Sequence, residues 1–372
     1  MSAADTRVWL ESLSVRDFRN FEKLDLKLPA DGVAIIGDNG HGKTNFLEAI
    51  YYLQTLRAER APRDQDLIRF GALGFHIAGK VRAPAAHDIS VGFERSTKRK
   101  KATLDGASPR RLADALGALP SVMFSPRDLE LVSGAPSERR RYLDLVLALT
   151  SKRYLHALQG YRANLVRRNA ALRDATRRGA NDSRVSVWEP ALAEHGAILI
   201  EARSKWVSES AGEFSTLCEK IGERGEVAMR YVSPFAESPA RYDALLSALE
   251  EKRPLDLRRG LTHVGPHRDE LELTLDGREL RLFGSAGQQR TAATALRMLE
   301  AATLKEHAGA EPILLLDDPF AELDSRRAAR ILELLQEAGL RQTILAVPRA
   351  SDIPPELMRL DRLTVRDGVI RG

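Results

Sequence analysis

A glycine-rich loop between a predicted strand and a predicted helix constrains this chain more than any other stretch. Residues 33–36 form a short apolar run, and residues 37–44 read GDNGHGKT, which matches the phosphate-binding loop pattern G-x-x-x-x-G-K-T. Apolar residues recur at helical spacing directly after the loop. A chance glycine-rich turn is the alternative, and the strand-then-helix context argues against it. The stretch therefore predicts a nucleoside triphosphate site.

The chemistry of such a loop gives each residue type a role. Glycines let backbone N–H groups turn toward an anion, and the N-terminus of the following helix adds partial positive charge. Lys43 is expected to reach the β- and γ-phosphates, and the Thr44 hydroxyl to hold Mg²⁺. The residues predicted to bind ATP are Gly37, Asp38, Asn39, Gly40, His41, Gly42, Lys43, Thr44 and Asn45.

A second motif supplies the acid that a phosphate-binding loop needs for its metal. Residues 313–316 are four consecutive apolar residues, typical of a strand buried on both faces, and Asp317 and Asp318 follow. Asp317 is expected to orient Mg²⁺ and Asp318 to polarise the attacking water. A strand that ends in a polar turn is the alternative. Because Lys43 and Asp317 lie so far apart in the sequence, the nucleotide fold is predicted to be split by a large insertion.

Length and composition agree with a split fold. At 372 residues the chain suits two lobes, or one large domain with an insertion. It is 43% hydrophobic and 29% charged, without an apolar run long enough to span a membrane, so we expect a soluble, cytoplasmic protein with no membrane partner. The single cysteine, Cys218, excludes an internal disulfide and a cysteine-based zinc site.

Positive charge is concentrated in one segment. Residues 151–180 hold eight basic residues against one acid, whereas the whole chain has a net charge of only +5. Such a cluster indicates a polyanion partner, with a solvated helix face as an equally weighted alternative. The candidate DNA-binding residues are Arg162, Arg167, Arg168, Arg173, Arg177 and Arg178. A second basic run at 98–101 could touch phosphate or be a solvated turn.

Residues 285–288 read SAGQ and open a predicted helix. A serine hydroxyl, flexible backbone N–H groups and a helix N-terminus form a second anion-binding geometry. Taken alone, a capped helix start is the simpler interpretation.

Together, these motifs resemble the ABC-type ATPase heads of the SMC class and, within it, the RecF family of bacterial recombination mediators. Further matching stretches are FRNF at 18–21, FSPRDL at 124–129, RRRYLD at 139–144, VGPHRD at 264–269 and GQQRT at 287–291. The resemblance implies an α/β fold: an ABC-type phosphate-loop ATPase head with mixed sheets, interrupted by a mainly helical arm. Expected boundaries are 1–141 and 256–372 for the head and 142–255 for the arm.

The resemblance also implies how the site works. In this family two heads dimerise with two ATP molecules between them, so Ser285, Gly287 and Gln288 would act on the nucleotide of the partner subunit. Asp324 would lie in a loop that crosses the dimer interface. Arg19 and Asn20 are expected to touch nucleotide, and the catalytic residues would be Lys43 and Asp318.

Two departures from the general ABC pattern imply slow hydrolysis. The acid after Asp317 is an aspartate rather than a glutamate, a feature that RecF relatives share, and residues 343–347 run into Pro348 where many ABC proteins have a switch histidine. His263 and His267 have a possible metal-ligand spacing, but Gly265 and Pro266 between them break any helix that could present both.

The predicted function is an ATP-dependent DNA-binding clamp in recombinational repair and replication restart. ATP would close a homodimer on duplex DNA or on gapped or single-stranded junctions, and slow, DNA-stimulated hydrolysis would release it. The resemblance implies recombinase loading at gaps, partners of the RecO and RecR kind and a place at the nucleoid. A transporter ATPase subunit and a structural head that binds ATP without turnover are the alternatives.

Overall fold

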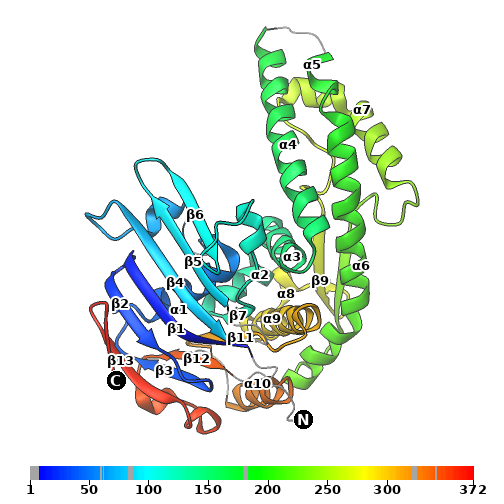
Figure 1. The fold of residues 1–372 in the computed structure, drawn as a ribbon. Helices are drawn as coiled ribbons and strands as arrows, with labels where there is room; N and C mark the ends of the chain where they lie inside the picture. Colours follow the sequence, from blue (N-terminus) through cyan, green and yellow to red (C-terminus); the bar gives the residue numbers. More distant parts are fainter. Residues whose placement is uncertain are drawn as a thin grey trace, which may run out of the picture. The chain divides into compact units, whose positions relative to one another are not determined.

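A computed structural model of the chain describes residues 8–58, 61, 63–82, 87–178, 183–319, 325–339 and 342–372. The chain divides into two compact units, one made of residues 1–128 and 296–372, the other of residues 129–295 (Figure 1). The first unit is α/β and the second mainly helical, as the sequence predicts.

The first unit contains an antiparallel sheet with the strand order β2-β1-β4-β5-β6. Hydrophobic and polar residues alternate along its strands, so one face of each strand lies in the core. In β4, for example, every second residue is buried. The strands are β1 (Trp9–Phe18), β2 (Phe21–Lys27), β4 (Gly74–Arg82), β5 (His87–Glu94) and β6 (Arg99–Leu104).

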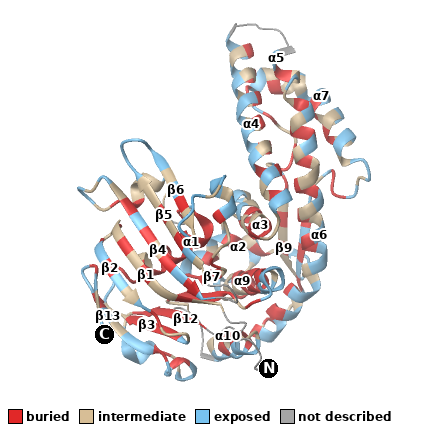
Figure 2. Ribbon diagram, in the orientation of Figure 1, coloured by how far each residue is buried: buried red, intermediate tan, exposed pale blue. Residues whose placement is uncertain are grey.

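The second sheet of this unit has the order β14-β13-β3-β12-β11-β7 and is parallel except for its β13–β14 hairpin. Every residue of β7, β11 and β12 is buried, because strands of a parallel sheet are covered on both faces (Figure 2). The strands are β3 (Gly32–Ile36), β7 (Ser121–Phe124), β11 (Ile313–Asp317), β12 (Thr343–Val347), β13 (Asp361–Arg366) and β14 (Val369–Arg371).

Helix α1 (Lys43–Thr55) contacts strands of both sheets, including β4, β7, β11 and β12. Its residues from Phe46 to Thr55 are all buried, as expected for a helix that is covered on every side. Helix α10 (Ser325–Glu337) also belongs to this unit, and α9 (Ala286–Ala308) spans the sequence boundary between the units. Short 3-10 helices lie at Asp64–Leu67, Leu112–Ala115, Pro126–Leu129, Ala350–Asp352 and Pro355–Leu357.

The second unit packs helices against one another and against a three-stranded sheet of order β10-β9-β8. Its long helices α4 and α6 lie side by side, and α7 packs on both (Figure 1). The main helices are α3 (Pro136–Thr150), α4 (Lys152–Arg178), α6 (Glu189–Ile221) and α7 (Arg241–Arg259), and the strands are β8 (Val227–Val232), β9 (Glu270–Leu275) and β10 (Arg278–Glu279). The short helices are α2 (Glu130–Ser133), α5 (Ser183–Ser186) and α8 (Leu280–Phe283).

The unit boundaries differ from the expected domain limits. Residues 129–141 and 256–295, expected in the head, belong to the same compact unit as the helices. The physical reason is strand pairing: β9 pairs antiparallel with β8, which follows the helices in sequence, and α3 packs on β9. Among the described residues, no helix combines the length and the apolar character needed to cross a membrane.

Candidate nucleotide-binding site

The predicted phosphate-binding loop connects β3 to α1, as the sequence pattern indicates. The last residue of β3 is Ile36 and the first of α1 is Lys43, so residues 37–42 form the loop. Gly42 has φ 114°, and a Cβ atom there would lie 2.6 Å from the Asn20 amide nitrogen, so both conformation and space require glycine. The loop therefore places backbone N–H groups and a helix N-terminus at one point.

The Lys43 amine lies against the loop. Its Nζ donates to the carbonyls of Gly37 at 2.5 Å and Asp38 at 3.0 Å, and to Asn39 Oδ1 at 3.4 Å. Burial lowers the pKa of Lys43, whereas the charges of Asp317, Asp318 and Asp38 act to raise it. The amine thus sits where the loop closes, next to the acids that follow β11.

Thr44 and Asp317 come together although they are far apart in the sequence. The Thr44 hydroxyl donates to both Asp317 carboxylate oxygens, at 2.9 Å each. Thr44 follows the loop after β3, and Asp317 is the last residue of β11. Both strands flank β12 in one parallel sheet, so their carboxyl ends lie at the same edge. A hydroxyl beside a buried carboxylate is an oxygen donor set that suits Mg²⁺.

Asp318 has an unusual backbone conformation. Its φ is 47°, in the left-handed region, and its N–H donates to the Ala346 carbonyl at 2.9 Å. Aspartate tolerates this region better than most residues. The charge of Asp318 acts on Lys43 together with that of Asp317.

The structure places Arg19 and Asn20 in support of the loop and helix. The Arg19 guanidinium donates to both carboxylate oxygens of Glu48 on α1, at 2.9 and 3.1 Å. Asn20 Nδ2 donates to the His41 carbonyl at 2.9 Å, and Asn45 Nδ2 donates to Asn20 Oδ1 at 2.9 Å. The predicted contact of these residues with nucleotide stays a prediction.

A second hairpin holds the same loop residue, and sequence reasoning missed it. At the β13–β14 turn, the Gly368 N–H donates to the His41 carbonyl at 3.1 Å and the Asp367 N–H to His41 Nδ1 at 3.0 Å. The signal was available: Asp367-Gly368 stands between two short runs that contain β-branched residues, which is a hairpin turn pattern. His41 is therefore held by turns from both ends of the chain.

Residues 285–288, the SAGQ motif that we call the signature stretch, lie at the start of α9. The Gln288 N–H donates to Ser285 Oγ at 3.3 Å, and the Ser285 N–H donates to Gln288 Oε1 at 2.9 Å. This reciprocal pair is a capping box, so the capped-helix interpretation is confirmed. Ser285 is exposed, and Leu282 and Phe283 just before it are 62% and 68% exposed. Gly287 is half-buried, and Asp324 lies outside the described residues.

One of the DNA contacts predicted on the basic helix α4 is wrong. Arg168 is fully buried, with its guanidinium paired to Glu189 at 2.8 Å and to Asp256 at 2.7 Å, so it cannot reach a phosphate. Arg162 is half-exposed and pairs with Asp144 at 2.8 Å. Exposed positions on the same helix are Arg167, which lies over the Trp188 ring, and Arg173 and Arg177. The side chain of Arg178 lies outside the described part of the chain.

Comparisons with known proteins identify the family and the fold of this chain. The family model of the RecF/RecN/SMC N-terminal domain matches residues 9–353. Two solved structures of the recombination mediator protein RecF in the RecFOR pathway are similar to this chain. The structure with ATPrS has a TM-score of 0.89 at 29% identity and covers 98% of this chain and 98% of its own. The structure with ATP has a TM-score of 0.90 at 28% identity and covers 100% of this chain and 99% of its own. An Smc head bound to a domain of ScpA shares the fold alone, with a TM-score of 0.54 at 17% identity over 98% of this chain and 96% of that chain.

Fold and site together define an ABC/SMC-type ATPase head. Two DNA replication and repair proteins RecF are each 35% identical to this chain. That of Lactobacillus delbrueckii subsp. bulgaricus matches over 96% of this chain and 95% of its own length, and that of Chloroflexus aggregans over 97% and 99%. The chain belongs to the RecF family of DNA replication and repair proteins.

Proposed function

We propose that this chain binds ATP at the loop of residues 37–45 and uses ATP to close a homodimer on DNA. The observation that carries the proposal is the meeting of Lys43, Thr44 and Asp317 at one edge of a parallel sheet, with Thr44 and Asp317 hydrogen-bonded at 2.9 Å. Open α/β sheets bind their ligands at this carboxyl edge. The amine of Lys43 would exchange its carbonyl partners in the loop for phosphate oxygens.

The chemistry of the site fits Mg²⁺, which would be held by Thr44 and by Asp317 through its water shell. When bound, the ion would neutralise charge on the β- and γ-phosphates. Asp318 would orient the attacking water as general base. Its side chain is shorter than the usual glutamate and no histidine follows β12, so we infer a slow Mg²⁺-dependent ATPase that DNA stimulates.

The dimer is proposed from the signature stretch. Ser285 is exposed at the start of α9, beside the exposed apolar side chains of Leu282 and Phe283. A serine hydroxyl and a helix N-terminus suit the γ-phosphate of a nucleotide held by a second subunit. Apolar exposure next to them suits a surface that a second copy would cover. Ser285, Gly287 and Gln288 would thus act in trans, with Asp324 in the interface loop.

The proposed partners are DNA and mediator proteins. Relatives called recombination mediators work in a RecFOR pathway, so we propose partners of the RecO and RecR kind and a role in loading recombinase at gaps. DNA contacts would be made mainly to phosphates, with slight sequence preference. Exposed arginines of α4, namely Arg162, Arg167, Arg173 and Arg177, would belong to this surface.

Sedimentation velocity with and without ATP and Mg²⁺ tests the proposal. We expect ATP to shift the parent from monomer to dimer and duplex DNA to strengthen the shift. Lys43→Met should abolish the shift, and the matched variant Lys23→Met, exposed on β2, should keep it. A protein that stays monomeric under all conditions would leave Ser285 without a nucleotide to meet and would overturn the dimer.

A further inference from the structure

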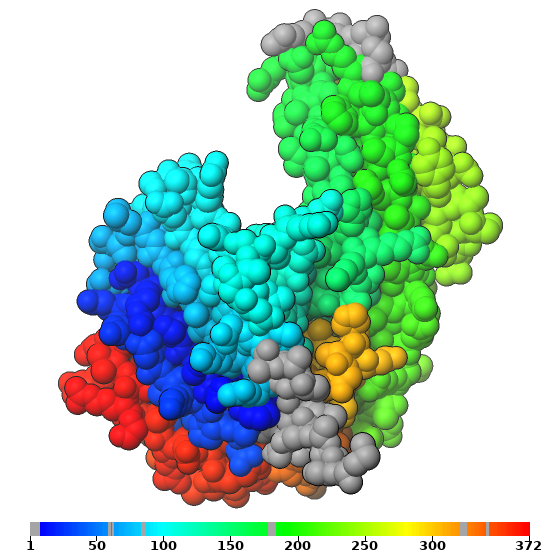
Figure 3. Space-filling view, in the orientation of Figure 1, coloured from blue at the N-terminus to red at the C-terminus, as the bar shows by residue number. Residues whose placement is uncertain are grey.

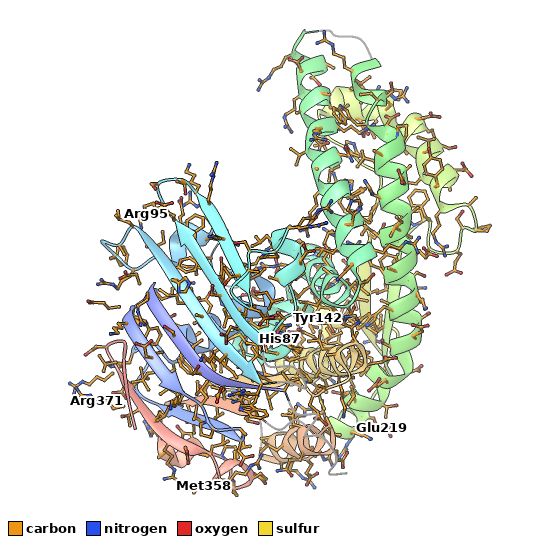
Figure 4. All side chains as sticks on the ribbon, in the orientation of Figure 1. His87, Arg95, Tyr142, Glu219, Met358 and Arg371 are labelled. Atoms are coloured by element: carbon orange, nitrogen blue, oxygen red, sulfur yellow. The ribbon has the colours of Figure 1, made fainter. Side chains whose placement is uncertain are left out.

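Two exposed segments meet at one end of the antiparallel sheet of the first unit. Residues 68–73 lie beside the β1–β2 turn, because the Arg69 N–H donates to the Asp17 carbonyl at 2.9 Å. They also lie beside the β5–β6 turn, because the Arg95 N–H donates to the Leu73 carbonyl at 2.8 Å. Figure 4 marks Arg95 at this end and His87 at the opposite end of β5.

The first segment, residues 68–73, exposes the aromatic ring of Phe70 to solvent. Phe70 is 99% exposed and Leu73 80% exposed. The backbone around the ring is fixed, since the Ala72 N–H donates to the Arg69 carbonyl at 3.1 Å and the Arg69 guanidinium pairs with Asp17 at 2.7 Å. Phenylalanine is usually buried, so this loop, held by hydrogen bonds, leaves an aromatic face free for a ligand.

The second segment, the β5–β6 hairpin, lies beside residues 68–73 and carries cations. Arg95, Lys98, Arg99 and Lys101 are exposed, and none of these four side chains forms an ion pair with another residue of the described chain. Lys100 points to the other face, where it pairs with Asp64 at 2.8 Å. The acid of the turn, Glu94, accepts from Ser96 and Thr97. Figure 3 shows the hairpin, in cyan, standing out at the surface.

We propose that this end of the sheet binds an unpaired stretch of DNA, with phosphates on the four cations and a base stacked on Phe70. The inference rests on the proposed DNA binding and assigns the unpaired strand of a junction to a particular surface of the first unit. Aromatic rings stack on bases of any sequence, and cationic grooves follow the backbone. Within a duplex the bases are already stacked on one another, so only the terminal base pairs of a blunt duplex offer a free face, whereas every base of an unpaired stretch can be splayed out.

The charge of the surface favours DNA over a protein partner. Protein interfaces have centres depleted of charged residues and bury a large area on each partner. Here a segment with two exposed apolar side chains lies beside a hairpin with four exposed cations, a composition typical of a nucleic-acid surface. Acids nearby are held in ion pairs: Asp17 and Glu22 with Arg69, and Asp64 with Lys100.

The test compares binding of a blunt duplex with binding of the same duplex carrying a single-stranded extension, in the presence of ATP and Mg²⁺. Phe70→Ala should weaken binding to the extended DNA by at least about fivefold and change binding to the blunt duplex by less than about twofold. Phe70→Trp should restore the preference, and Met358→Ala, which shortens another exposed apolar side chain (Figure 4), should leave it intact. A 2-aminopurine in the extension should lose fluorescence on binding the parent but not Phe70→Ala.

Charge reversal tests the cations in the same way. Arg95→Glu should weaken binding to both DNAs, whereas Arg371→Glu, an exposed arginine on β14, should not (Figure 4). Equal affinity of Phe70→Ala and the parent for the extended DNA would overturn the stacking site and leave the proposed function standing. Loss of ATP affinity or of the ATP-driven dimer in Phe70→Ala would also overturn the stacking site. It would mean that the Phe70 ring contacts nucleotide or a second copy of the chain instead of DNA. A parent that binds neither DNA would sink the proposed function itself.

Discussion

At the scale of single residues, a substitution of Asp318 distinguishes a slow ATPase from a head that binds ATP without hydrolysing it. We expect Asp318→Asn to lower steady-state ATP turnover by about 10²-fold, because an amide cannot act as general base. The ATP-driven dimer should persist, since Lys43, Thr44 and Asp317 are intact. Phosphate release and sedimentation velocity measure the two effects, with Asp361→Asn, exposed on β13, as the control. Equal turnover of Asp318→Asn and the parent would mean that Asp318 is not catalytic.

His267 gives the second unit a predictable sensitivity to acid. Its Nε2 faces the Thr262 carbonyl at 3.1 Å and its Nδ1 faces the Tyr161 hydroxyl at 2.6 Å, so the neutral ring is satisfied at both nitrogens. Burial lowers the pKa of His267 to about 4, with Arg268 and Arg140 acting in the same direction and Asp256 against it.

Because the folded-state pKa lies below the unfolded value, the unfolded chain takes up the proton first as the pH falls. The contribution of His267 is therefore fully present above about pH 6.5 and is lost between about 6.5 and 4, by roughly 3 kcal/mol in total. Urea unfolding of His267→Gln should show a shallower loss of stability over this range than the parent. His307→Gln, which removes an exposed histidine on α9, should keep the slope of the parent.

The residues of the site were more predictable than the residues of the surface. Thr44 and Asp317 follow strands of a parallel sheet, and the carboxyl ends of such strands share an edge, so their meeting could be predicted from the sequence. The burial of Arg168 could not be predicted from the sequence, because its partners Glu189 and Asp256 come from other helices. A count of charges along a helix does not say which of its arginines face the protein interior.

At the scale of elements, the β13–β14 hairpin is expected to position the phosphate-binding loop. Gly368 has φ 76°, and a Cβ atom there would lie 2.3 Å from the Asn20 carbonyl oxygen. Gly106 offers a matched control: it follows an aspartate in a similar turn, also has φ 76°, and has nothing within 4 Å of its Cβ position. Alanine at either position bears the same left-handed strain of about 1 kcal/mol.

Gly368→Ala should therefore weaken ATP binding, because the clash displaces the turn that holds His41, whereas Gly106→Ala should not. Titration with a fluorescent ATP analogue measures the affinity, and urea unfolding of both variants separates the shared strain from the clash. Equal ATP affinities of the two variants would show that the hairpin is only a neighbour of the loop.

Sequence patterns located most elements but not their association. Apolar patterns predicted α1 and β11, whereas β13 and β14 are short and largely exposed and gave no prediction. The pairing of β8 with β9, which moves residues 256–295 out of the expected head, joins strands on either side of α7 and depends on tertiary contacts.

At the scale of the whole molecule, the net charge of +5 conceals two separate basic surfaces, one in each unit. Exposed arginines of α4 lie in the second unit and the β5–β6 hairpin in the first. Each phosphate contact that is lost should lower the dependence of log affinity on log salt concentration by about 0.9. The number of phosphate contacts from each unit can therefore be measured separately.

We expect the affinity of the parent for DNA to fall steeply between about 50 and 200 mM salt, as for proteins that contact several phosphates. The pair Arg173→Ala and Arg177→Ala should reduce the slope by about 2, because both side chains are exposed on α4 and deleting each removes one phosphate contact. Arg366→Ala, an arginine 89% exposed on β13, should leave the slope unchanged. An unchanged slope for the α4 pair would remove the helical unit from the DNA-binding surface, and an affinity insensitive to salt would exclude phosphate contacts altogether.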